Sequence, residues 1–174
     1  MSSKSTWVGD GSREIYVAST QAGIATTIAL STTQTGFTLT NPAGSGKTLV
    51  LLRVDCAVSA APGGAAPLVL SANVNPVAAA VTQTTALTVR RANLGVSGTG
   101  AGLAASGTTL PAAPVVVAAL QAPVAGSAIT PANINVEFDG SICIAPGCAL
   151  NLASITTAVT GIWSMTWEEV DEIS

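Results

Sequence analysis

Residues 41–48 come close to a nucleotide-binding motif, since they read Asn-Pro-Ala-Gly-Ser-Gly-Lys-Thr. A phosphate-binding P-loop needs glycine, four further residues and then Gly-Lys-Ser/Thr, because its backbone N–H groups wrap the phosphates at the start of a helix. Asn41 stands in place of the first glycine. The residues after Lys47 predict a strand, because polar Arg53 and Asp55 alternate with apolar neighbours. We therefore interpret Lys47 as part of a turn and expect no nucleotide cofactor.

Few residues of this chain are suited to acid–base catalysis. The chain contains no histidine and one tyrosine, so catalysis would depend on carboxylates. Two adjacent acidic pairs, at 168–169 and 171–172, are expected at an exposed chain end, where burial cannot tune their pKa values. Glu137 and Asp139 share one expected strand face; such a pair could serve a glycosidase or a calcium site, although a solvated face is commoner. We predict that the protein is not an enzyme and has no catalytic residues.

Three cysteines, Cys56, Cys143 and Cys148, are the remaining reactive side chains. Their odd number, and a first segment without the apolar stretch of a signal peptide, argue against a disulfide framework. Cys143 and Cys148 flank a turn and could approach each other across a hairpin, but a metal site would need further ligands. We interpret all three as reduced, buried, small apolar residues and expect no bound metal.

The charge content limits the partners that this chain can bind. Charged residues make up 9% of the sequence, against about 25% in typical soluble domains, while hydrophobic residues make up 48%. A net charge of −3 lacks the positive surface that nucleic acids require, and neighbouring Arg90 and Arg91 would point to opposite faces of a strand. The best candidate for a membrane span, residues 111–129, is interrupted by three prolines. We therefore expect no nucleic-acid or membrane partner, and infer that other protein subunits cover the apolar surface.

The elements that hold these residues are predicted to be strands throughout. Short segments rich in threonine, valine and isoleucine alternate with Gly/Pro turns, which is typical of an antiparallel sandwich or barrel. Trp163 and Trp167 fall on the same face of the last strand and are interpreted as core residues, with a sugar-stacking platform as the alternative. The expected strands cover residues 15–18, 24–30, 37–40, 48–60, 68–74, 86–92, 133–139, 142–144, 148–152 and 157–170.

The length of 174 residues predicts a single domain. Residues 1–14 are expected to form an N-terminal arm. Not one charged residue occurs from 92 to 136, and residues 95–131 are rich in alanine, glycine and proline. We expect a loop-rich insertion at 95–131 that packs against a neighbouring subunit, because a free segment this apolar would aggregate.

Three turn and strand features carry a resemblance to a known family. They are the turn at 41–46 between two strands, the Ala-Pro-Gly turn at 145–147 before Ala-Leu-Asn-Leu, and the closing strand that ends in Trp-Glu-Glu-Val at 167–170. Together they resemble the jelly-roll capsid cement, or decoration, proteins of tailed bacteriophages. The resemblance covers residues 36–58 and 134–171. It implies an all-β, antiparallel, jelly-roll-like β-sandwich without catalytic residues, in which the insertion at 95–131 is an addition.

The resemblance also implies a function. Such proteins clamp neighbouring major capsid protein subunits on the outside of the expanded head, commonly as dimers or trimers. We therefore expect a virion structural protein on the capsid surface, assembled in the host bacterial cytoplasm. Its expected partners are the major capsid protein and further copies of itself, as a homotrimer or, alternatively, a dimer. The alternative is a carbohydrate- or host-binding jelly-roll module of a phage head fibre or tail. An aromatic content of only 3% favours the first function, because sugar binding depends on exposed rings.

Overall fold

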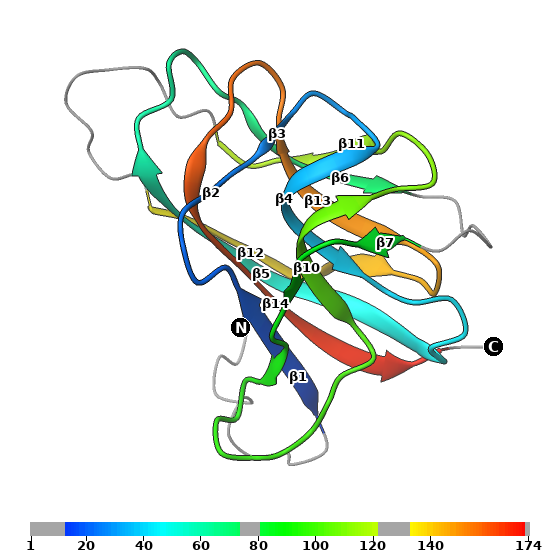
Figure 1. Ribbon diagram of the computed structural model, residues 1–174. Coiled ribbons are helices and arrows are strands. Elements are labelled where there is room, and N and C mark those ends of the chain that lie inside the picture. The colour runs from blue at the N-terminus through cyan, green and yellow to red at the C-terminus, as the bar shows by residue number, and fades with distance from the viewer. Residues whose placement is uncertain (1–12, 74–80, 122–132, 173–174) are drawn as a thin grey trace.

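The computed structural model describes residues 13–73, 81–121 and 133–172. Every regular element within these ranges is a strand, and the strands form two sheets (Figure 1). This arrangement confirms the all-β fold that the alternating sequence pattern predicts. It follows from the local sequence, because β-branched residues with period-two alternation suit a pleated surface that is buried on one face.

The six-stranded sheet has the order β12-β5-β14-β1-β9, with β2 paired to β14, and all of its pairings are antiparallel. β5 and β14 form its centre and pair along almost their whole length. The strands are β1 (Glu14–Ser19), β2 (Ile24–Ala25), β5 (Lys47–Ala60), β9 (Arg90–Arg91), β12 (Asn133–Ile144) and β14 (Thr160–Asp171).

The eight-stranded sheet has the order β11-β6-β13-β4-β10-β7, with β3 paired to β13 and β8 paired to β10. Its pairings are antiparallel except for the short parallel contact between β3 and β13. The strands are β3 (Thr27–Ile28), β4 (Thr33–Thr40), β6 (Leu68–Asn73), β7 (Thr82–Gln83), β8 (Ala86–Leu87), β10 (Leu103–Thr109), β11 (Val115–Ala119) and β13 (Ala149–Ser154).

The core lies between the two sheets. Trp163, Met165 and Trp167 of β14 are buried, as the alternation in the last strand predicts, and Tyr16 stacks on Trp167 with ring centroids 6.2 Å apart. Both tryptophans are therefore core residues. Each such side chain contributes roughly 1.5–3 kcal/mol through burial of apolar surface. The inner face of the other sheet supplies buried leucines at positions 39, 68, 70, 150 and 152.

Four predicted strands are divided or joined in the structure. The segment at 24–30 is divided at Thr26 into β2 and β3, which belong to different sheets. The segment at 86–92 is likewise divided into β8 and β9. In both places the chain crosses from one sheet to the other, and local alternation does not reveal which sheet a strand joins. Residues 133–144 form one strand, because a bulge with positive φ at Asp139 and Gly140 replaces the turn expected there.

The predicted insertion at 95–131 is partly built into the sandwich. Its described residues contain β10, which pairs with β4, and β11, which pairs with β6. Ala104 and Ala105 of β10 are buried, so this stretch supplies core residues and is not loop-rich there. Small side chains suggested flexibility by composition, although they also suit a closely packed strand. Residues 122–131 of the predicted insertion, and 1–12 of the predicted arm, lie outside the described residues.

Candidate interaction surface

The charged residues that the structure describes are confined to one of the two sheets. Within the described ranges, every charged residue lies on a strand of the six-stranded sheet or directly beside one, and the strands of the eight-stranded sheet carry none. The charged residues are Arg13, Glu14, Lys47, Arg53, Asp55, Arg90, Arg91, Glu137, Asp139, Glu168, Glu169, Asp171 and Glu172. The low charge content of the chain is therefore concentrated in one layer of the molecule.

A hydrogen-bonded row of uncharged polar side chains crosses the eight-stranded sheet. The hydroxyls of Thr38 and Thr108 lie 3.0 Å apart, and Thr38 donates to Asn151 Oδ1 at 2.9 Å. Asn151 Nδ2 donates to the backbone carbonyl of Ser71 at 3.2 Å. All four residues are buried. The row thus links β10, β4, β13 and β6 without an ionised group, because each buried polar atom in these contacts has a neutral partner.

The loop that resembles a P-loop is organised around Asn41. This buried side chain donates from Nδ2 to the carbonyls of Lys47 at 2.7 Å and Ile144 at 2.8 Å, and its Oδ1 accepts a hydrogen bond from Ser45 Oγ at 2.6 Å. Lys47 is the first residue of β5, which confirms that a strand and not a helix leaves the loop. Asn41 thus fills the loop with its own side chain where a P-loop glycine would leave room for phosphate.

Lys47 faces carboxylates of neighbouring strands. Its Nζ lies 2.8 Å from Asp171 Oδ1 and 3.3 Å from Glu14 Oε2, and Arg91 contacts the other oxygen of Glu14 at 3.0 Å. The hydrogen bond to Asp171 is the main reason that the pKa of Lys47 is raised, and the same bond lowers the pKa of Asp171. The lysine of the motif is therefore part of an ion-pair network between β1, β5, β9 and β14.

Glu169 differs from the prediction for the acidic chain end. It was expected to be exposed, but it is 5% exposed and its carboxylate accepts hydrogen bonds from the backbone N–H groups of Ala101 and Gly102 at 2.8 and 2.9 Å. Trp167 Nε1 donates to the same carboxylate at 3.1 Å. The alternation that turns Trp167 inward continues through Glu169, so the sequence contained this signal. Asp171 and Glu172 are exposed as expected.

Glu137 and Asp139, the acids expected to share a strand face, are exposed on β12. The described residues contain no group of three or more His, Cys, Asp or Glu that could hold a metal ion.

The three cysteine thiols are free. Cys56 and Cys148 are buried, but Cys143 is exposed, contrary to the expected burial of all three. Burial raises the pKa of Cys56 to about 12 and also raises that of Cys148.

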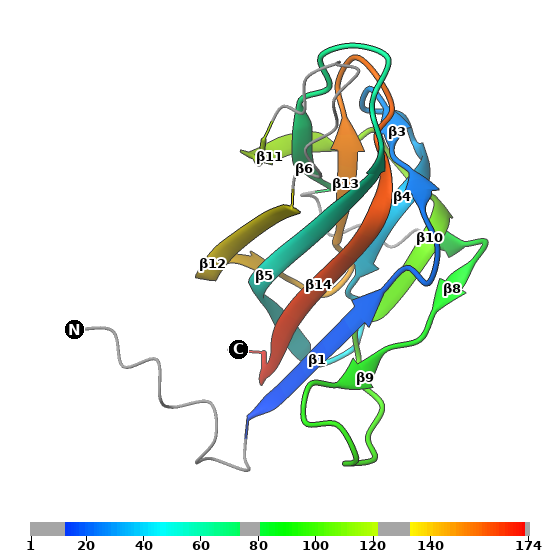
Figure 2. The same cartoon turned by 90° about the vertical axis from the view of Figure 1, so that its left-hand side faces the viewer.

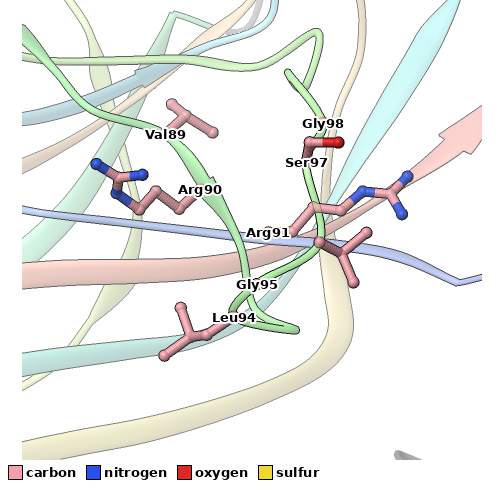
Figure 3. A pocket seen from close by; sticks show the side chains of 8 residues that line it. Val89, Arg90, Arg91, Leu94, Gly95, Ser97 and Gly98 are labelled. Carbon is pink, nitrogen blue, oxygen red and sulfur yellow. The ribbon is translucent and has the colours of Figure 1, made fainter.

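Arg90 and Arg91 lie beside a pocket of about 180 Å³ formed with the glycine-rich residues 94–98. Figure 3 shows the two guanidinium groups directed away from each other, as expected for neighbours on a strand. Arg91 contacts Glu14 and lies over the ring of Tyr16, 5.8 Å from its centroid. The two arginines therefore do not converge on a common ligand.

Exposed apolar side chains are concentrated on the uncharged sheet. Six of the nine large ones among the described residues belong to its strands or follow one directly, and we call these six the apolar surface. They are Ile28, Leu103, Val115, Val116, Val117 and Ile155, with exposed fractions of 37–50%. The absence of charge and the exposure of apolar groups therefore coincide in one sheet, which is the candidate interaction surface. Among the described residues, no helix has the length and apolarity to cross a membrane.

Comparisons with protein-family models, with curated proteins and with solved structures find no match to this chain.

Proposed function

We propose that the protein is a virion structural protein, a capsid cement or decoration protein that binds and stabilises neighbouring major capsid protein subunits on a phage head. The observation that carries this proposal is the coincidence of the apolar surface with a sheet whose strands have no charged residue. Charged residues are depleted at the centres of protein interfaces, whereas aliphatic side chains gain free energy when a partner removes them from water. The phage capsid as the partner comes from the sequence resemblance.

We further propose that the sandwich is a jelly roll, and the strand order supports this. Eight strands can be numbered along the chain as β1, β4, β5, β6, β11, β12, β13 and β14. In this numbering, the strand order across the six-stranded sheet is 6-3-8-1, from β12 to β1. The order across the eight-stranded sheet is 5-4-7-2, from β11 to β4. This order supports a jelly roll, an architecture found in viral capsid proteins and lectins. In this proposal, β7 to β10 follow the fourth strand and precede the fifth, and β10 extends the sheet beside β4.

The surroundings of the aromatic residues favour the structural role over the alternative, a carbohydrate- or host-binding module. Trp163 and Trp167 are 0% exposed, and Tyr16 is 2% exposed. Phe37 is also buried and Phe138 is partly buried. A sugar-stacking site needs an exposed ring face, and none of the aromatic residues that the structure describes supplies a fully exposed one. Trp7 lies outside the described residues.

The proposal is tested with phage heads that lack this protein, prepared from the phage whose genome encodes the chain. Purified protein should sediment with these heads and raise the temperature at which they release DNA. Val116→Lys adds one charge to the apolar surface and should weaken this binding. Leu94→Lys makes the same change of charge at an exposed side chain after β9 of the other sheet, and should not. Failure of the wild-type protein to bind these heads, together with binding to host cells or host glycans, would favour the alternative.

A further inference from the structure

The edges of the two sheets differ in how well they are protected from pairing with further strands. On one side, the short strands β9, β7 and β8 lie outside β1 and β10. On the other side, the outermost strands are β12 and β11, and Figure 2 shows both on the side away from β8 and β9. β12 has a bulge at Asp139 and Gly140, and carries Glu137 as well. Charges and bulges are the features by which natural proteins prevent unwanted strand pairing at an edge.

β11 has much less of this protection. The sequence from 92 to 136 contains no charged residue. Val115, Val116 and Val117 are 48%, 45% and 41% exposed. A register shift between Val116 and Ala118 marks one bulge, and within the described chain β6 is the only hydrogen-bonded neighbour of β11. Among the described residues, β11 therefore presents an uncharged, valine-rich edge without a second strand partner, of the kind that pairs with another strand.

We propose that this edge binds a second copy of the same chain, with the two β11 strands antiparallel across a two-fold axis. A two-fold interface places each residue against residues of the same patch, so a charged strand would meet like charges. β11 has none, and the charges among the described residues lie on the six-stranded sheet. Valines paired across antiparallel strands are favourable, because β-branched side chains pack well there. The two eight-stranded sheets would then form one continuous sheet.

This inference concerns the self-association expected from the sequence, and it does not depend on the capsid as the partner. It predicts a dimer, whereas the sequence favoured a trimer, because one strand edge accepts one antiparallel partner. A contact between two five-residue strands is smaller than the standard interface of about 1,600 Å². We therefore expect a reversible dimer with a dissociation constant on the order of micromolar. Simultaneous binding of both copies to a capsid would strengthen attachment through avidity.

The test combines sedimentation velocity with hydrogen exchange on the full chain. From low to high micromolar concentration, the wild-type protein should shift from monomer to dimer, and exchange in a peptide covering 115–119 should slow as the dimer forms. Val116→Lys should weaken dimerisation at least tenfold, because each copy would bring a positive charge to the junction. Leu94→Lys is the matched control, since Leu94 is 78% exposed on the loop after β9 and the charge change is identical. Circular dichroism and thermal melting check that both variants fold.

Several results would overturn the pairing. One is a wild-type chain that stays monomeric over the whole range. Another is slow exchange at 115–119 that does not depend on concentration, which would assign the edge to a segment of the same chain. A trimer, or equal weakening by both lysine variants, would place the self-contact elsewhere. Because these measurements use no capsid, they can fail while the proposed binding to heads holds, and the reverse is equally possible.

Discussion

At the scale of single residues, Glu169 shows how one buried carboxylate can fix a loop. Its two oxygens accept hydrogen bonds from Ala101, Gly102 and Trp167, and so connect the end of β14 to the segment that enters β10. A Cβ atom at Gly100 would lie 2.5 Å from Glu169 Oε1, so a larger residue there would push the carboxylate away from its hydrogen-bond donors. Hydrogen bonds to a charged acceptor are stronger than neutral ones, which compensates for removing the carboxylate from water.

Glu169→Gln tests this role. The amide keeps the size of the side chain but replaces one acceptor oxygen with a donor, so at least one N–H group of the loop loses its partner. We expect a loss of roughly 1–3 kcal/mol in the free energy of unfolding, the usual cost of an unsatisfied buried polar group. Glu172→Gln is the control at an exposed position and should stay within about 0.5 kcal/mol. Urea denaturation of the three proteins gives the comparison, and equal stabilities would contradict the anchoring role.

Asn41→Gly completes the P-loop consensus, so this variant tests whether the sequence motif alone is enough for nucleotide binding. We expect no binding of magnesium ATP by calorimetry, because β5 begins at Lys47 and provides no helix N-terminus for the phosphates. We also expect stability to fall by roughly 1–3 kcal/mol, since Asn41 satisfies the carbonyls of Lys47 and Ile144. A saturable ATP isotherm for the variant or for the wild-type chain would refute our interpretation of this loop.

The three thiols should react at different rates. Cys143 is exposed, whereas burial of Cys56 raises its pKa to about 12, so little thiolate forms there at pH 8 in the folded state. In the native protein we expect one fast thiol with an aromatic disulfide reagent, and the other two should be slow. Denaturation in urea should expose three thiols per chain. Cys143→Ser should remove the fast phase alone; a fast phase that persists would show that our assignment is wrong.

At the scale of elements, β10 decides whether the alanine- and glycine-rich stretch is an insertion or part of the fold. β10 pairs with β4 along 103–109; Leu103 at its start is exposed, whereas the next residues, Ala104 and Ala105, are buried. This pairing explains why a segment without charge can be stable. Its backbone hydrogen bonds are satisfied in the sheet and its small side chains allow close packing.

Neighbouring substitutions in β10 test its position. Ala104→Asp buries a carboxylate in the core and should destabilise the protein by about 3 kcal/mol or more. Leu103→Asp adds the same charge at a side chain that is 44% exposed, and should cost much less. Thermal melting distinguishes the two. If the stretch were a loop-rich insertion outside the sandwich, both variants would melt like the wild type.

At the scale of the whole molecule, charge and apolar exposure divide the sandwich into two unlike layers. The six-stranded sheet carries ion pairs such as Arg53–Asp55 and Lys47–Asp171, which keep its surface hydrated. The eight-stranded sheet carries the apolar surface and the neutral row through Thr38 and Asn151. This division separates the surface that faces water from the surface that we propose for binding to protein.

Salt should therefore have little effect on self-association. The proposed β11 junction contains no charged residue, so screening of charges by added salt removes no attraction there. We expect the dissociation constant of the dimer to change by less than about threefold between low and high sodium chloride, and sulfate to strengthen the dimer slightly through apolar burial. Sedimentation at several salt concentrations measures this. A steep weakening with salt would show that charged groups form the interface.

The sequence by itself determined the features that depend on neighbours along the chain. Period-two alternation predicted the all-β fold and the burial of Trp163 and Trp167, because inward and outward positions are set by the pleat of a single strand. The same local reasoning predicted a strand after Lys47 and the opposed directions of Arg90 and Arg91. The absence of charge from 92 to 136 predicted packing against a neighbouring subunit, but the described part of this stretch also contains β10 and β11 of the sandwich.

Only the tertiary structure decided which distant segments meet. The crossing between sheets at Thr26, the place of β10 beside β4, and the position of β11 at the edge of the described sheet depend on pairing partners far away in the sequence. The burial of Glu169 likewise depends on a loop more than sixty residues earlier, whose N–H groups happen to lie within reach of its carboxylate. Such contacts follow from the closure of the sandwich, because alternation states which face a side chain occupies but not what lies opposite that face.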